Sequence, residues 1–328
     1  MEIKPLSVLV AGCGSIGKRH ARVLRSLGVR DIRVCDPDTE QRGALVGEGP
    51  VSREYAVFES ALQDDPDTVL ICTPPELHIP MAIQALNSGA HVLSEKPLSD
   101  SLDLVKELDT TIERTGKVFA VAYCFRHHEG LTLAKQYLEE NRIGRLVSLR
   151  LRMGEHLPEV RPDFKKLFTL TRGGAFDLTH EIDLACWFAD QPATEVHSLH
   201  EACSDLGFTA PDLVELIIRF GERCIASVHL DLFSLPRTRV TELMGTTGTI
   251  TVEFARWDSC TVSVYDQAGG HWKQEELTTA RDEMFRRQDR EFLQAVASGT
   301  PVSCPLSEAV KSQKIISLAG GCSDPPKR

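Results

Sequence analysis

The chain has 328 residues, 42% hydrophobic and 26% charged, which is the composition of an ordinary globular protein long enough to form two domains. Its formal net charge of -10 argues against partners that are bound through clustered Lys and Arg, so we expect neither nucleic-acid nor membrane binding. The ten cysteines are scattered without metal-ligand spacing, so we expect no metal and a cytoplasmic protein whose thiols are reduced.

The first part of the chain alternates short apolar runs with amphipathic stretches, which is the pattern of βαβ units and a parallel sheet. We predict strands at Val8–Ala11, Ile32–Cys35, Val69–Cys72, His91–Leu93 and Val118–Ala122. A helix with an apolar stripe toward the sheet is predicted from the helical spacing of Ile16, Val23, Leu24 and Leu27. We therefore expect residues 1–124 to form a doubly wound Rossmann domain.

A glycine-rich sequence directly follows the first predicted strand and opens the helix. It matches G-x-G-x-x-G at Gly12, Gly14 and Gly17. In such a loop the first glycine permits a tight turn, the second lets the backbone approach a pyrophosphate, and the third lets helix and strand pack closely. We expect Ser15 and Ile16 to lie at the same dinucleotide site. The alternative is a glycine turn that binds nothing.

Asp36 lies at the end of the second predicted strand, 19 residues beyond Gly17. A carboxylate at this position hydrogen-bonds the adenosine ribose diol and repels a 2'-phosphate. Pro37 and Asp38 follow it, in place of an Arg or Ser that would receive that phosphate. The sequence therefore favours NAD over NADP as cofactor, with a plain turn-forming role for Asp36 as the alternative.

The pattern changes after Cys124, and we place a domain boundary there. The next predicted elements are a helix (Glu129–Asn141), a strand (Leu146–Met153), an irregular segment (His156–Arg172) and a helix (Gly174–Ala189). Strand-like runs follow without intervening helices at Glu195–Leu199, Leu213–Phe220, Cys224–Leu232, Arg239–Met244, Thr249–Phe254 and Thr261–Tyr265. Two helices, Glu283–Ala297 and Leu306–Ala319, close the chain. Residues 125–328 are thus predicted to form an α+β domain with a mostly antiparallel sheet.

Several motifs, in this order along the chain, resemble those of the Gfo/Idh/MocA family, which is named for glucose-fructose oxidoreductase and inositol dehydrogenase. They are the glycine loop through His20, Ile71–His78, Ser94–Pro97, Tyr123–His128, Gly173–Asp183 and Glu291–Gly299. Each motif is a weak signal alone, but the ordered set is specific and spans nearly the whole chain. One departure is Glu129, where the family often has proline after the tyrosine-x-x-arginine-x-histidine segment.

The resemblance implies a fold, a reaction and a set of site residues. The fold is a Rossmann domain joined to a substrate-binding domain with a large open sheet, through which members often form homodimers or homotetramers. Members oxidise a secondary alcohol of a sugar, sugar derivative or cyclitol, or run the reverse reduction. By this likeness Lys96 is catalytic, Glu95 contacts the nicotinamide-side ribose, and Thr73, Pro74 and His78 line the dinucleotide.

The chemistry can also be argued from the residues. Hydride transfer from an alcohol carbon requires a base for the hydroxyl proton, and His180 provides an imidazole suited to that task near neutral pH. We expect Lys96 to hydrogen-bond the reacting oxygen and relay the proton. Asp177, three residues before His180, would support it from the same helix face. In the inositol dehydrogenase type this spacing is four, so Asp183 is the alternative functional carboxylate.

The segment Met153–Pro162 leads toward the predicted helix that carries His180 and is long for a plain connector. Such long loops are commonly functional. Arg126 and Arg161, together with Asp183, are our candidate substrate residues. The basic residues hint at an anionic sugar, and the loop resembles that of family members linked to surface-polysaccharide and nonulosonate biosynthesis. The alternative is an ordinary solvated basic face.

Two other functions remain open at this point. The first is a non-catalytic regulator that senses a dinucleotide, although such a protein needs the glycine loop but neither Lys96 nor His180. The second is an enzyme that reduces a C=N bond or eliminates from a sugar through transient oxidation. The sequence does not separate that chemistry from alcohol oxidation, because both use the same residues beside the nicotinamide.

Overall fold

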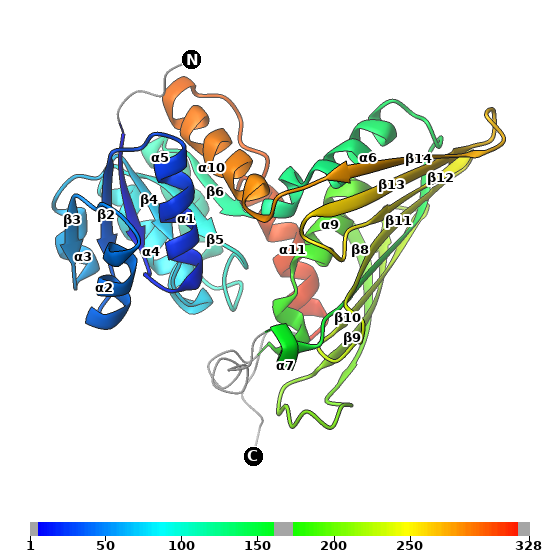
Figure 1. Cartoon of the computed structure of the whole chain (residues 1–328), viewed down its shortest axis with the longest axis horizontal. Coiled ribbons are helices and arrows are strands. Elements are labelled where there is room, and N and C mark those ends of the chain that lie inside the picture. Colours follow the sequence, from blue (N-terminus) through cyan, green and yellow to red (C-terminus); the bar gives the residue numbers. More distant parts are fainter. Residues whose placement is uncertain (1–5, 161–172, 321–328) are drawn as a thin grey trace. The chain divides into compact units, whose positions relative to one another are not determined.

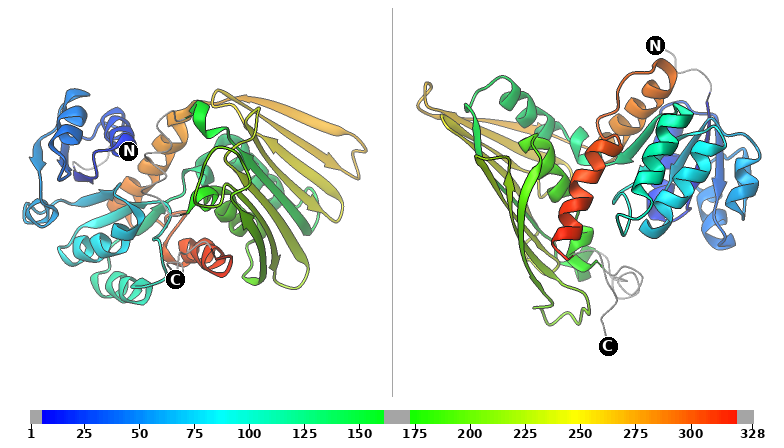
Figure 2. Two further views of the ribbon diagram at one scale, coloured as in Figure 1. Left: turned by 90° about the horizontal axis from the view of Figure 1, so that it is seen from below. Right: turned by 180° about the vertical axis from the view of Figure 1, so that it is seen from behind.

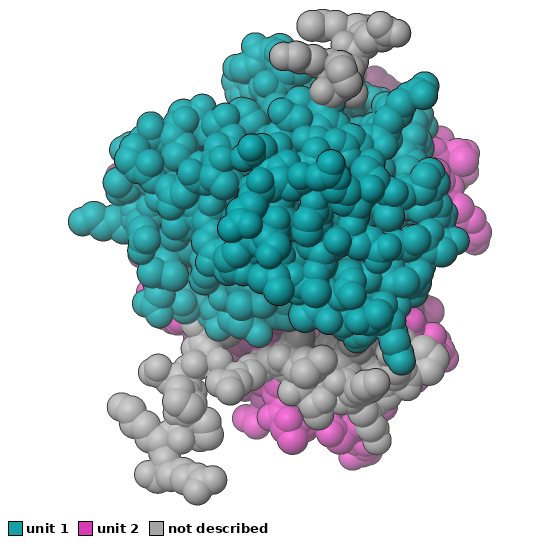
Figure 3. All heavy atoms as spheres, turned by 90° about the vertical axis from the view of Figure 1, so that its left-hand side faces the viewer, with its two compact units in different colours: residues 1–124, 282–310 teal, residues 125–281, 311–328 magenta. Residues whose placement is uncertain are grey.

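The computed structural model describes residues 6–160 and 173–320 of the chain. It divides into two compact units, which are coloured separately in Figure 3. Unit 1 consists of Met1–Cys124 with Asp282–Val310, and unit 2 of Phe125–Arg281 with Lys311–Arg328. The sequence-based division left residues 282–310 in the second domain. They pack in unit 1 instead, because Phe292 and Leu293 are buried among the side chains of its sheet.

Unit 1 contains a six-stranded sheet in which every pair of neighbouring strands is parallel. Its spatial order, β3-β2-β1-β4-β5-β6, is that of a doubly wound dinucleotide-binding fold. The strands are β1 (Ser7–Ala11), β2 (Asp31–Cys35), β3 (Arg53–Tyr55), β4 (Thr68–Ile71), β5 (His91–Glu95) and β6 (Phe119–Ala122). The predicted Rossmann domain is therefore confirmed.

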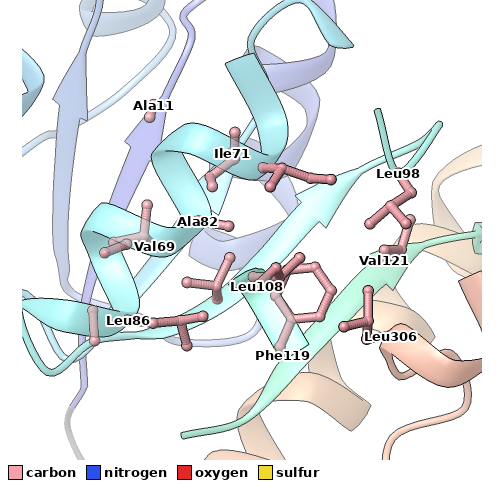
Figure 4. Close-up of a cluster of buried hydrophobic side chains, with 14 of the residues drawn as sticks. Ala11, Val69, Ile71, Ala82, Leu86, Leu98, Leu108, Phe119, Val121 and Leu306 are labelled. Atoms are coloured by element: carbon pink, nitrogen blue, oxygen red, sulfur yellow. The ribbon is translucent and has the colours of Figure 1, made fainter. Parts of the chain in front are cut away.

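Helices lie on both faces of this sheet (Figure 1, Figure 2). They are α1 (Ser15–Ser26), α2 (Thr39–Gly47), α3 (Phe58–Leu62), α4 (His78–Asn87), α5 (Val105–Thr115) and α10 (Arg281–Ser298), with a short 3-10 turn η1 (Pro75–Leu77) before α4. Alternate residues of a strand face opposite sides of its sheet. Accordingly, Leu9 and Ala11 of β1 join the core cluster of Figure 4, whereas Val8 and Val10 join a second cluster that contains α1 and α10 residues.

Unit 2 contains an eight-stranded sheet in the order β14-β13-β12-β11-β7-β10-β9-β8. Only β7 and β10 pair in parallel, and the other neighbours are antiparallel, as predicted. The strands are β7 (Leu146–Gly154), β8 (Ala193–Glu201), β9 (Leu213–Phe220), β10 (Cys224–Asp231), β11 (Thr238–Gly245), β12 (Gly248–Glu253), β13 (Ser259–Asp266) and β14 (Trp272–Thr278).

One face of this sheet packs against helices, as Figure 2 shows. Helix α9 contacts β7 and β10, and α6 contacts β12 and β13. The helical elements of this unit are η2 (Cys124–His127), α6 (Glu129–Glu139), α7 (Leu157–Val160), η3 (Gly174–Asp177), α9 (His180–Ala189) and the larger part of α11 (Leu306–Leu318). In β9 buried and exposed residues alternate, so Glu215, Ile217 and Arg219 project from the opposite face.

Two strands were not predicted, and both lie at sheet edges. Strand β3 has only three residues, and β14 is exposed along almost its whole length. An edge strand pairs on one side only and gains little from apolar side chains, so neither produces the apolar run on which the prediction depended. Within the described residues, no helix is long and apolar enough to cross a membrane. Eight of the nine described cysteines are buried, and no two of the nine form a disulfide.

Candidate dinucleotide and catalytic site

The glycine loop connects β1 to α1, and two of its glycines are required by the backbone. Gly12 has φ +97, and a Cβ at this position would lie 2.5 Å from the carbonyl oxygen of Cys72. A Cβ on Gly17 would lie 1.9 Å from the carbonyl oxygen of Gly12. These approaches are far too close for any side chain, so both glycines allow strand and helix to pack as they do.

Gly14 differs, because a Cβ at that position would meet nothing within 4 Å and its φ is -68. The fold does not need a glycine here, so the open space is available to a ligand. Helix α1 begins at the next residue, Ser15, with no side-chain cap and no acidic residue in its first turn. Its first N–H groups and the positive end of its dipole are suited to a phosphate. The loop therefore fits a dinucleotide pyrophosphate.

This contrast gives a matched pair of variants. Gly17→Ala is expected to reduce the free energy of unfolding by at least about 2 kcal/mol, because the new methyl group must displace backbone. Gly14→Ala is expected to change it by less than about 0.5 kcal/mol, yet to raise the Kd for NADH at least about tenfold. Urea unfolding and NADH fluorescence titration measure the two effects. Wild-type NADH affinity in Gly14→Ala would contradict the assignment of this loop.

Asp36 follows β2 and lies against the glycine loop. Its Oδ2 accepts a hydrogen bond from the backbone N–H of Cys13 at 2.8 Å, and its Oδ1 accepts one from the N–H of Asp38 at 2.9 Å. The carboxylate thus forms the predicted turn and also anchors the loop. Arg42 on α2 was not among the predicted site residues. Its guanidinium donates to the Asp36 carbonyl and to the Thr39 hydroxyl. The sequence signal for Arg42 was a basic residue six positions after Asp36.

The loops after β4 and β5 are joined by His78. This side chain is 1% exposed, and its two ring nitrogens lie 2.8 Å from the carbonyl oxygen of Thr73 and 2.7 Å from that of Pro97. Burial lowers the pKa of His78, so the ring is neutral and donates to one of the two carbonyls. The expected role for His78 was to line the dinucleotide. Its observed contacts hold the Thr73–Pro74 loop against the loop that follows Lys96.

Glu95 is the last residue of β5 and is only 8% exposed. Its Oε2 accepts a hydrogen bond from the backbone N–H of Lys96 at 3.1 Å, and its Oε1 lies 3.0 Å from Nε2 of His20. The other ring nitrogen of His20 lies 2.8 Å from Oδ2 of Asp289 on α10. From the sequence, His20 was recognised only as part of the glycine-loop motif and had no predicted role of its own. No local pattern reveals its partners, because Asp289 is 269 residues away.

In unit 2, two glycines shape the turn that leads to His180. Gly174 has φ +54, and a Cβ on it would lie 2.2 Å from a backbone carbonyl oxygen. A Cβ on Gly173 would lie 2.4 Å from Oδ1 of Asp177. The turn η3 ends at Asp177, and α9 begins at His180. The single helix predicted over Gly174–Ala189 is therefore wrong, because left-handed backbone and a two-residue break interrupt it.

His180 stacks on Phe125, with ring centroids 4.1 Å apart and planes inclined by 22°. The guanidinium of Arg239 also lies over Phe125, 4.5 Å from the ring centroid, and its Nε is 2.9 Å from Oε1 of Glu181. Glu181 and Arg239 are both buried. None of the three neighbours Phe125, Glu181 and Arg239 was among the predicted site residues. Buried and partly buried residues alternate along β11, and Arg239 occupies a buried position. An arginine at a buried strand position indicates a buried charge pair.

Arg126 and Asp183, two of the candidate substrate residues, are bonded to each other. Arg126 Nε donates to Asp183 Oδ2 at 2.9 Å, and its Nη2 donates to Oδ1 at 2.7 Å. Both side chains are 1% exposed. Both oxygens of Asp183 and two nitrogens of Arg126 are thus engaged in this buried ion pair. The pair joins η2 to α9, the elements that carry Phe125 and His180.

The third candidate substrate residue, Arg161, lies outside the described residues. In the described part of unit 2, Arg237 and Arg281 both lie over Trp257, with guanidinium carbons 4.3 and 4.5 Å from its ring centroid. Arg237 also pairs with Glu155, with N–O separation 3.2 Å. Burial and the neighbouring Arg239 lower the pKa of Arg237 to about 10, which is still high enough to keep it charged.

Comparison with known proteins connects both parts of the chain to one family. Residues 6–123 match the family model described as oxidoreductase family, NAD-binding Rossmann fold, and residues 131–251 match the GFO/IDH/MocA C-terminal domain. An inositol 2-dehydrogenase from Rubrobacter xylanophilus is 26% identical over 58% of this chain and 54% of the relative. A levoglucosan dehydrogenase from Pseudarthrobacter phenanthrenivorans is 30% identical over 62% of this chain and 60% of the relative. These alignments thus span little more than half of each relative.

A solved structure extends the likeness over nearly the whole fold. The structure of GenD2 from gentamicin A biosynthesis, in complex with NAD, superposes with a TM-score of 0.83 and 25% sequence identity. It covers 98% of this chain and 95% of that protein. Both the parallel sheet of unit 1 and the larger sheet of unit 2 are therefore shared with a protein that binds NAD.

Proposed function

Since the chain belongs to the Gfo/Idh/MocA family of oxidoreductases, we propose that it transfers a hydride between NAD and a secondary alcohol or ketone of a sugar, sugar derivative or cyclitol. The observation that carries this proposal is the placement of Lys96. It follows β5 at the carboxyl edge of the parallel sheet, the edge at which the glycine loop follows β1. Ligands of doubly wound folds bind at this edge. Relatives named inositol and levoglucosan dehydrogenase support the substrate class.

Bound NAD supplies the carbon that accepts or donates the hydride, and the chain's residues manage the proton. Lys96 hydrogen-bonds the reacting oxygen, and His180 takes the hydroxyl proton as oxidation proceeds. Between the two candidate carboxylates, Asp183 is held by Arg126, so Asp177 is the one we assign to support His180. In this proposal the Arg126–Asp183 ion pair supports the site by joining η2 to α9, and neither side chain contacts the substrate.

We propose NAD as the physiological cofactor in preference to NADP. The carboxylate of Asp36 adjoins the glycine loop through its bond from Cys13, so a ribose 2'-phosphate placed beside it would meet a like charge. Arg42 reduces that repulsion, but its guanidinium is already engaged by the Asp36 carbonyl and Thr39. Pro74 and Thr73, together with Ser15 and Ile16, complete the proposed dinucleotide contacts.

For the substrate, we keep Arg161 as a proposed contact and add Arg237 and Arg281, whose stacked guanidinium groups favour an acidic or phosphorylated sugar. We propose further that the chain forms a homodimer or homotetramer through the uncovered face of the large sheet. Its exposed Ile217 and Ile225, which are 49% and 42% exposed, support an apolar contact there. The described cysteines form no disulfide with one another, which accords with the cytoplasmic location that we propose.

The function is tested with a panel of polyols, neutral sugars, uronic acids and nucleotide sugars, each supplied with NAD+ or NADP+. We expect absorbance at about 340 nm to rise with at least one panel member, and more with NAD+ than with NADP+. Tight NADH binding without turnover on any member, in either direction, would overturn the enzyme assignment. That result would favour the dinucleotide-sensing regulator.

A further inference from the structure

A buried histidine joins three elements of unit 1 at the base of the proposed site. His20 lies on α1, six residues after Gly14, and is 1% exposed. Its ring nitrogens face Glu95 at the end of β5 and Asp289 on α10. This one side chain therefore connects the helix of the glycine loop, the strand that precedes Lys96, and a helix from the far end of the sequence.

The geometry and the charges of the two carboxylates together favour a charged ring for His20. The nitrogen-to-oxygen distances are 2.8 Å to Asp289 and 3.0 Å to Glu95, and carboxylates only accept hydrogen bonds. A neutral imidazole has a single N–H, whereas an imidazolium donates from both nitrogens. Burial lowers the pKa of His20, but the charges and hydrogen bonds of Asp289 and Glu95 outweigh that effect and raise it to about 10.

Besides His20, the described neighbours of the Glu95 and Asp289 carboxylates include neutral groups, among them the amide of Gln288, whose Nε2 donates to Asp289 Oδ1 at 3.4 Å. The Cys72 thiol lies near both, and burial raises its pKa well above the ordinary value, so it remains neutral. Phe285 packs edge-on against the His20 ring, with centroids 5.7 Å apart. The neutral ring of His78 also interacts electrostatically with Glu95. His20 is thus the cation that lies directly between Glu95 and Asp289.

The carboxylate that His20 holds is also bonded to the backbone of Lys96. Oε1 of Glu95 faces His20, and Oε2 accepts the N–H of Lys96 at 3.1 Å. Because both oxygens are engaged, the orientation of the Glu95 carboxylate is fixed. The peptide group between Glu95 and Lys96 is held in place with it. Without a cation, two buried carboxylates would move apart or bind a proton, and the bond to Lys96 would weaken.

We propose that His20 is a positioning residue: a permanently protonated imidazole that keeps Glu95 ionised and oriented, and through Glu95 fixes the backbone of Lys96 for dinucleotide binding and proton transfer. The part that concerns Lys96 rests on the function proposed above. The charge state of His20 and its effect on NADH affinity do not, since both are measured without turnover.

The first test uses the unmodified protein. In a 15N-histidine NMR titration, with His20 assigned by comparison with His20→Gln, both ring nitrogens are expected to remain protonated from about pH 6 to about pH 9. A neutral His20 ring at about pH 7.5 would overturn the proposal. This measurement needs no substrate, and a variant is needed only to assign the His20 signals. If His20→Gln does not fold, His20→Asn or Asp289→Asn can provide that assignment.

The second test separates charge from packing. His20→Gln leaves two carboxylates without a cation, whereas His20→Gln/Asp289→Asn restores the original net charge of the cluster. We expect the Kd for NADH in His20→Gln to rise at least about tenfold and to increase between about pH 6 and pH 8, where the wild type is flat. The double variant is expected to regain the flat profile, with a Kd within about threefold of wild type.

Two results of this second test would contradict a positioning role. One is a His20→Gln protein that loses thermal stability but binds NADH with the wild-type pH profile, which is the behaviour of a merely structural residue. The other is a double variant as impaired as the single one. If substrate turnover has been found, kcat for His20→Gln should fall more than its KM rises. If none has been found, the NADH results still decide the role of His20.

Discussion

Lys96→Met is expected to reduce kcat by about 10²–10⁴-fold on any substrate that the panel identifies, since the variant lacks the group that hydrogen-bonds the reacting oxygen. The Kd for NADH should stay within about threefold of wild type, because the Glu95 bond to residue 96 is made by the backbone N–H. Steady-state kinetics and NADH titration measure the two effects. The exposed Lys106→Met on α5 serves as the control and should behave as wild type.

The same variant tests whether Lys96 and His180 act on one proton transfer. His180→Asn alone should also lower kcat strongly. If the two residues serve a single step, Lys96→Met/His180→Asn should be little slower than the worse single variant, since effects within one catalytic unit are not additive. Multiplied losses in the double variant would mean that the two residues serve separate steps. Lys96→Met with near-wild-type kcat would contradict the proposed chemistry.

Arg126→Met is expected to lower the free energy of unfolding by about 3–5 kcal/mol, because it leaves the carboxylate of Asp183 buried without its guanidinium. In Arg126→Met/Asp183→Leu both charges are removed, and most of that loss should be recovered. Urea unfolding of the two variants measures the difference. The control is Arg256→Met, which breaks an exposed ion pair with Asp258 and should leave the midpoint unchanged.

If Arg126→Met/Asp183→Leu is as unstable as Arg126→Met, the lost free energy of unfolding comes from packing and not from the unpaired, buried carboxylate of Asp183. A substrate-contact role for Arg126, as first predicted from the sequence, gives a different pattern. In that case Arg126→Lys would keep wild-type stability while KM increased, whereas a buried pair with two hydrogen bonds is sensitive to this substitution.

The two sheets could be predicted from the sequence because the burial of each strand is reflected in its own pattern of apolar residues. Strands of a parallel sheet are covered on both faces, so β1 and β4 appear as unbroken apolar runs, and the half-covered strand β9 appears as an alternation. The glycine loop was predictable for a related reason. Gly12 and Gly17 are required by contacts within one strand-turn-helix unit, so their spacing is fixed by local geometry.

The charged interior of both units could not be predicted, because its partners are far apart in the sequence. Arg126 and Asp183 are 57 residues apart, and His20 and Asp289 are 269 apart. Neither periodicity nor composition distinguishes a buried, paired charge from a solvated one. Asp183 was therefore considered as a carboxylate for catalysis, and His20 was quoted but given no role. The start of α9 was missed for another reason, since a helical pattern does not reveal the backbone break before His180.

Residues 282–310 follow most of unit 2 in the sequence but pack in unit 1, and this order affects how the protein can fold during synthesis. The chain passes between the units after residues 124, 281 and 310. Phe292 completes one core cluster of unit 1, and Leu306 completes the other. A ribosome must therefore translate most of unit 2 before the final apolar residues of unit 1 exist. Until then the nascent dinucleotide unit lacks side chains that complete its two apolar cores, so its final packing follows the synthesis of most of unit 2.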